Sequence, residues 1–268
     1  MAKARNRRHV GLFVEGVNTL TSRSRDDLAE LWRHQCSRLG RTSDVAVYGF
    51  SKHQLVLMDP GQKLPNKTKI PLDVFIKQKF DEEPFDVLII AFDAEPENQA
   101  ITTVPEGQAP CLRLEKDFVL TRLADSSFVP ERFRRASRQL LAHYERQRAT
   151  PRPPSVPPIG AVELVYMAPM FEDLILHDRI ALRDVFGLSK TPKSWPELEG
   201  QRRPDFVLKK IVDAHRRTGP KHLRVTFDAA KHAWALEVLR KARENSPIWT
   251  HPIAERVRKV VPLARIAG

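Results

Sequence analysis

The chain has 268 residues, 41% of them hydrophobic, which is enough for one large α/β domain or two small ones with a sizeable core. Lys and Arg total 45 against 33 Asp and Glu, and the resulting formal charge of +12 favours a polyanionic partner such as nucleic acid. The two cysteines, Cys36 and Cys111, are far apart and indicate neither a disulfide framework nor a zinc site. No apolar run reaches the roughly 20 residues of a membrane span. We therefore expect a soluble cytoplasmic protein.

The first strand predicted from the sequence ends in a lone carboxylate. Val10–Val14 is a short apolar run, and Glu15 and Gly16 follow it directly. A second strand is expected over 44–50, and Lys52 comes just after it. Because α/β folds place ligands at the carboxyl edge of parallel strands, Glu15 and Lys52 are candidate catalytic residues. A carboxylate in such a position also commonly belongs to a turn or caps the next helix.

A third strand, expected over 85–92, brings more carboxylates to the same edge. Asp93 and Glu95 follow this strand. Carboxylate oxygens are the ligands that Mg²⁺ prefers, and the ion keeps several waters for substrate phosphates. The pattern therefore predicts a divalent-cation site suited to cutting phosphodiester bonds.

Residues 97–159 depart from the strand and helix alternation and form a predicted insertion. Its helix, expected over 131–148, has one apolar face and many arginines around the rest. Three of these arginines are candidate nucleic-acid ligands: Arg134, Arg135 and Arg138. They suit contacts to a phosphate backbone, although charged helices usually just present a solvated face. The proline-rich stretch 151–158 is expected to be a stiff connector.

A fourth strand is expected over 161–167, and the block 169–178 after it contains Glu172 in an apolar run. Charged residues are seldom buried unless they are paired or bind a cation, so Glu172 is a further candidate metal ligand. Alternatively, Glu172 lies in the first turn of a helix and complements its dipole. We interpret His177 and Asp178 as a structural pair rather than a catalytic dyad.

The remaining pattern is helical. One helix is expected over 26–39, and the chain from Pro204 onward is predicted to be helical with breaks at 218–220 and 246–247. Phe206 is assigned to an apolar helix face together with Leu208. The sequence therefore predicts an α/β fold, a mostly parallel sheet flanked by helices, with an inserted helical segment and a helical C-terminal region.

Three short motifs in this pattern resemble the TOPRIM fold. They are Glu15-Gly16 after the first strand, Asp93-x-Glu95 after the third, and the block Met170–Asp178. More narrowly, the chain resembles the RloB proteins and the TOPRIM domain of OLD-family nucleases, which belong to prokaryotic phage defence. The resemblance runs loosely from Val10 to about Val261, and it implies a single TOPRIM-like domain over 1–268 with 97–159 inserted.

The resemblance also implies roles for individual residues. Glu15 would be the general acid or base, or a metal ligand. Asp93 and Glu95 would hold Mg²⁺ or Mn²⁺, and Glu172 would complete a second metal position, as in two-metal phosphoryl transfer. Glu95 stands where the family pattern has aspartate, and no acid follows Gly16, since the chain continues Val17-Asn18-Thr19.

These roles imply a metal-dependent nuclease that cuts DNA or RNA in antiviral defence. Related proteins often act beside or fused to an ATPase, and this sequence lacks the GxxxxGK[ST] loop of a nucleotide hydrolase, so an ATPase partner is implied. No G-x-S-x-G motif supports a serine triad. Two alternatives remain open. One is a PIN or NYN ribonuclease, which Asn18 suits, and the other is a basic nucleic-acid-binding adaptor with a degenerate acidic site.

Overall fold

The structure is a computed structural model, and it describes residues 9–16, 22–40, 44–51, 54, 70–93, 112–149, 160–167, 171–195 and 204–261. Within these ranges the strands are β1 (Val10–Glu15), β2 (Val45–Phe50), β3 (Val87–Asp93) and β4 (Val162–Met167). They form a sheet in the order β2-β1-β3-β4, and every neighbouring pair is parallel. The predicted α/β class with helices flanking a parallel sheet is thus confirmed.

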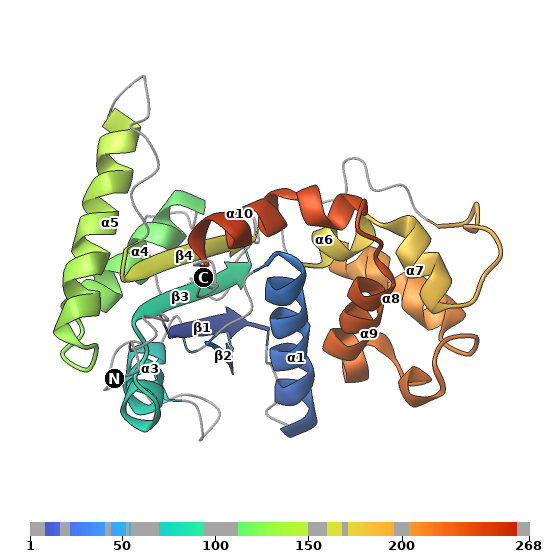
Figure 1. The fold of residues 1–268 in the computed structure, drawn as a ribbon, viewed down its shortest axis with the longest axis horizontal. Coiled ribbons are helices and arrows are strands. Elements are labelled where there is room, and N and C mark those ends of the chain that lie inside the picture. The colour runs from blue at the N-terminus through green and yellow to red at the C-terminus, as the bar shows by residue number, and fades with distance from the viewer. Residues whose placement is uncertain are drawn as a thin grey trace, which may run out of the picture.

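Helices connect and follow the strands. The α-helices are α1 (Ser22–Arg38), α3 (Leu72–Glu82), α4 (Leu112–Asp125), α5 (Glu131–Ala149), α6 (Phe171–Leu176), α7 (Arg179–Val185), α8 (Pro204–His215), α9 (Phe227–Lys241) and α10 (Pro252–Val260). Two short 3₁₀ helices, η2 (Lys221–Leu223) and η3 (Pro247–Thr250), flank α9. Figure 1 shows α5 at one end of the molecule and α6 to α9 at the other, with the sheet between them.

The central strands are apolar on both faces because helices cover both. Successive residues of a strand point to opposite sides, and the buried side chains of β1 and β3 fall accordingly into two clusters. Leu12 and Ile89 pack on the side of α1 and of α6 to α10. Phe13 and Ile90 pack on the side of α3, α4 and α5. This two-sided burial explains why the strands appear in the sequence as continuous apolar runs.

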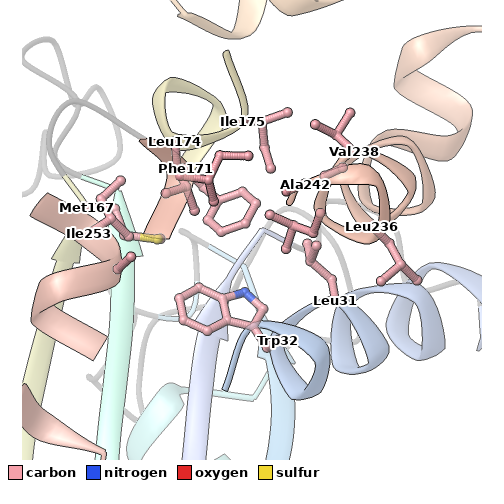
Figure 2. Close-up of a cluster of buried hydrophobic side chains, with 14 of the residues drawn as sticks. Leu31, Trp32, Met167, Phe171, Leu174, Ile175, Leu236, Val238, Ala242 and Ile253 are labelled. Carbon is pink, nitrogen blue, oxygen red and sulfur yellow. The ribbon is translucent and has the colours of Figure 1, made fainter. Parts of the chain in front are cut away.

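Apolar residues fix the position of the short helix α6, which carries Glu172. Phe171, Leu174 and Ile175 lie on one helix face and point into the cluster drawn in Figure 2. The ring centroids of Phe171 and Trp32 of α1 are 5.6 Å apart. Burying these side chains contributes about 1.5–3 kcal/mol each, which anchors α6 beside the ends of β1 and β3.

The structure corrects several boundaries and assignments. Helix α1 begins at Ser22 rather than at 26, and β3 covers Val87–Asp93 rather than 85–92. Two helices, α3 and α4, were not predicted individually. Phe206 does not lie on the buried face of α8, since its side chain is 51% exposed while Leu208 is buried. The connector expected over 151–158 lies outside the described residues.

None of the helices in the described residues is both long and apolar enough to cross a membrane.

Candidate functional site

Three of the predicted acidic residues meet at the carboxyl edge of the sheet. Glu15 is the last residue of β1 and Asp93 the last residue of the neighbouring β3. The backbone N–H of Asp93 donates to Oε2 of Glu15 at 3.2 Å. The N–H of Phe171, which begins α6, donates to Oδ1 of Asp93 at 3.0 Å. These bonds join both strand ends to the helix that carries Glu172, and all three carboxylates are buried.

A lysine from α9 completes this group. Nζ of Lys231 forms an ion pair with Oε1 of Glu172. Burial favours the neutral amine and so lowers the pKa of Lys231, but the negative charges of Glu172, Asp93 and Glu15 outweigh burial and raise this pKa above its ordinary value. Lys231 is therefore an ammonium ion held among three carboxylates. We call Glu15, Asp93, Glu172 and Lys231 the acidic centre.

Lys231 is the most exposed member of the acidic centre, and Glu172 has unused bonding capacity. The Glu172 side chain is 2% exposed, whereas that of Lys231 is 35% exposed. Oε2 of Glu172 is buried and accepts no hydrogen bond from the described residues. A buried carboxylate oxygen without a donor is costly unless a cation satisfies it. The oxygen donors thus fit a hard divalent cation, with Lys231 as a competing or additional positive charge.

Helix α9 also supplies a histidine next to the end of β1. Gly16 has φ +144°, a backbone conformation that favours glycine, and a Cβ built at this position would lie 3.2 Å from Nε2 of His232. The buried imidazole of His232 therefore packs directly against the residue that follows Glu15. The backbone angle therefore favours glycine at position 16, and a side chain there would also press on the imidazole of His232.

The sequence did not predict Lys231 and His232 as site residues. Their helix is interrupted at Ala230, whose φ of −142° and ψ of 33° are not helical, and Lys231 comes directly after this kink. One signal was present in the sequence: Lys231 is a charged residue among alanines and large apolar residues of α9. Such a pattern indicates a lysine on a helix that packs closely against the rest of the protein. That signal does not identify the acids that the lysine meets.

Two predicted site residues cannot be placed. Lys52 and Glu95 lie outside the described residues, as does Asn18, on which the PIN or NYN alternative relied. The candidate second carboxylate after β3 and the candidate catalytic lysine after β2 therefore stay predictions.

The arginines of α5 are partly engaged with neighbours. Arg134 and Arg138 both pair with Glu131 in the first turn of the helix. Arg138 also donates to the carbonyl of Ala124 at 3.0 Å and so ties α5 to α4. Arg135 is exposed and forms no ion pair within the described residues. Of the three, Arg135 is the one whose charge is most available to a phosphate.

The adjacent His177 and Asp178 make separate contacts. Asp178 caps α7 by accepting from the N–H of Ala181 at 2.7 Å, and it also accepts from the hydroxyl of Ser246. Nδ1 of His177 instead lies 3.0 Å from the carbonyl oxygen of Asp173. The interpretation of these two residues as a pair is wrong, because Asp178 faces the chain before η3 while His177 folds back over α6.

Comparison with protein-family models, with curated proteins and with solved structures found no match to this chain.

Proposed function

We propose that the chain is a divalent-metal-dependent nuclease that hydrolyses phosphodiester bonds at the acidic centre, with Mg²⁺ or Mn²⁺ as the metal. The observation that carries this proposal is the meeting of Glu15, Asp93 and Glu172 from two adjacent strand ends and α6, beside a partly exposed lysine. A parallel sheet with this edge chemistry is also consistent with the TOPRIM-type fold that the sequence motifs resemble.

The bound metal would polarise the phosphate and lower the cost of forming a water-derived nucleophile. Around it, Asp93 and Glu172 would act as ligands through their carboxylate oxygens. Glu15 would ligate or accept the proton of the attacking water. As the new P–O bond forms and the bond to the leaving sugar oxygen breaks, negative charge grows on the phosphoryl oxygens. Lys231, on the solvent side, would stabilise that charge.

The substrate in this proposal is DNA or RNA, which the net charge of +12 favours. The resemblance to RloB and OLD proteins adds a setting in prokaryotic antiviral defence and an ATPase as partner protein. Neither follows from the geometry of the site.

A second function has one observation in its favour. Lys231 already neutralises Glu172, so the acidic centre also fits a purely structural ion-pair cluster in a nucleic-acid-binding adaptor. In that case the chain would bind nucleic acid without cutting it and would not need Mg²⁺.

Cleavage of end-labelled DNA and RNA by the purified chain, with Mg²⁺, with Mn²⁺ and with a chelator, tests both functions. We expect metal-dependent cleavage that Asp93→Asn reduces at least about a hundredfold, the scale of losing a group that acts on the transition state. Asp81→Asn, at an exposed residue of α3, is the matched control and should cleave normally. Binding without cleavage under every metal condition would favour the adaptor.

A further inference from the structure

A second group of potential metal ligands lies outside the acidic centre. Asp173 belongs to α6, His177 follows the end of that helix, and His251 precedes α10. One ligand atom from each of these residues lies within 4.8 Å of those from the other two. Nε2 of His251 and Oδ2 of Asp173 are 3.1 Å apart, and the two imidazole rings meet edge-on with centroids 4.4 Å apart. Two segments far apart in the chain thus bring three donors to one point.

The donors differ in kind from those of the acidic centre. Two imidazoles and one carboxylate suit Zn²⁺ and similar first-row transition metals, whereas a group of carboxylates suits Mg²⁺ or Mn²⁺. The 3.1 Å separation is near the roughly 3.3 Å between two ligands of a tetrahedral ion with bonds of about 2.0–2.1 Å. His251 is buried but His177 is exposed, so an ion can enter from solvent and keep a water in its fourth position.

The hydrogen bond of His177 already suits metal binding. Its Nδ1 lies 3.0 Å from the carbonyl oxygen of Asp173, and only a protonated Nδ1 can donate to a carbonyl. The other ring nitrogen, Nε2, then keeps its lone pair. Metal-binding histidines usually have this arrangement, with one nitrogen donating to a backbone carbonyl and the other on the metal.

His251 requires an exchange of bonds. Its Nδ1 accepts from the N–H of Ile253 at 3.2 Å and caps α10, so its Nε2 carries the proton and donates to Asp173. When a metal takes Nε2, the ring proton moves to Nδ1, the hydrogen bond to Asp173 gives way to metal–ligand bonds, and the N–H of Ile253 loses its acceptor. The ring stays neutral in this exchange. Binding is thus weaker than at a fully preformed site.

We propose that Asp173, His177 and His251 bind one transition-metal ion of the zinc class, which links α6 to the start of α10. Asp173 directly follows Glu172, so the ion would also hold the helix that carries a residue of the acidic centre. This proposal does not depend on nuclease activity.

The test uses the full-length chain without an affinity tag, because a histidine tag binds the same metals. Equilibrium dialysis against Zn²⁺ in excess Mg²⁺ measures stoichiometry and affinity, and visible absorption of the Co²⁺ form reports nitrogen ligation. We expect one Zn²⁺ per chain. His177→Ala and His251→Asn should each weaken binding about 10–100-fold. Asparagine is a good helix cap, so His251→Asn removes the ligand while keeping an acceptor for the N–H of Ile253.

Two controls separate the proposed sites. His222→Ala removes another exposed histidine and should leave Zn²⁺ binding unchanged. Asp93→Asn with Glu172→Gln changes only the acidic centre and should also bind Zn²⁺ normally. The proposal is overturned if the parent chain binds no Zn²⁺, or if binding survives both His177→Ala and His251→Asn. Loss of binding only in the acidic-centre variant would assign the ion to that centre instead.

Discussion

The ammonium group of Lys231 forms an ion pair with the buried carboxylate of Glu172, so α9 supplies positive charge where we propose that a metal ion binds. Clustered carboxylates without such a partner would repel one another. In the apo protein the acids of the acidic centre are therefore partly neutralised by Lys231.

Glu172→Gln should destabilise the protein. If Glu172 only repelled the neighbouring carboxylates, the same substitution would leave the protein equally or more stable. The substitution removes one partner of a buried ion pair, and Asp93 and Glu15 compensate only in part, so we expect a loss of about 1–3 kcal/mol in the free energy of unfolding. Urea unfolding measures it. In a Lys231→Met background the same substitution should cost much less, whereas an effect on the dipole of α6 alone would persist there at about 0.3–1 kcal/mol.

Lys231→Met should make stability depend on Mg²⁺. Without the ammonium, the buried carboxylates of the acidic centre lose a neutralising charge that an added cation can replace, and a ligand that binds the folded state raises its stability. Thermal melts with and without Mg²⁺ should show a larger increase in Tm for the variant than for the parent chain. Lys209→Met, at an exposed lysine of α8 that pairs with Asp228, is the control. An equal Mg²⁺ response in both variants and the parent would contradict this prediction.

Gly11→Ala should destabilise the centre of the sheet. A Cβ at this position would lie 2.8 Å from ring atoms of Phe85, and that buried ring stacks on Phe133 with a centroid distance of 5.5 Å. The ring cannot move without disturbing its own packing, so we expect a cost of about 1–3 kcal/mol in urea unfolding. Gly160→Ala, where the nearest atom is 3.7 Å away, should change stability by less than about 0.5 kcal/mol.

Arg135→Glu should weaken nucleic-acid binding without affecting folding, because Arg135 is exposed and forms no ion pair in the described part of the chain. Arg138→Glu should affect both, since Arg138 holds the carbonyl of Ala124. Fluorescence anisotropy at several salt concentrations should show a shallower salt dependence for Arg135→Glu. Arg217→Glu, an equal charge change beyond α8 at the far end of the molecule from α5 in Figure 1, tests for a general charge effect. If Arg135→Glu and Arg217→Glu reduced the affinity for nucleic acid equally, the charged face of α5 would be an ordinary solvated surface.

Glu163 should make stability fall as the pH rises. Burial raises the pKa of this β4 carboxyl, although the N–H of Gly160 and the charge of Arg256 lower it in part. The folded state then binds the proton more tightly than the unfolded chain, so the contribution is present below the unfolded pKa, about 4.3, and is lost as pH rises through the folded one. Urea unfolding from pH 4 to neutrality should show Glu163→Gln gaining stability relative to the parent. A constant difference would contradict this sign.

The sequence predicts the strands and the acids that follow them better than it predicts the helices. Strands that are buried on both faces appear in the sequence as apolar runs, and a parallel sheet brings their carboxyl ends to one edge. The sequence could therefore predict that Glu15 and Asp93 lie close together. Helix α3 was missed although Leu72 and Ile76 have helical spacing, and α4 was missed because its apolar residues do not form a clean stripe. Lys231 was out of reach, since pairing between distant helices and strand ends depends on tertiary packing.

The packing of α9 against α1 has a consequence for synthesis of the chain. Arg240 of α9 pairs with Glu30 of α1, and Lys231 reaches the end of β1, so the last third of the chain completes a site begun by the first strand. A ribosome makes β1 and β3 long before α9. Until α9 docks, the carboxylates of Glu15 and Asp93 lack their lysine, and the face of the sheet that α1 covers lacks part of its packing. Assembly from segments so far apart in the chain is slow. The nascent chain therefore needs α9, which is made late, both to cover exposed apolar surface and to complete the acidic centre.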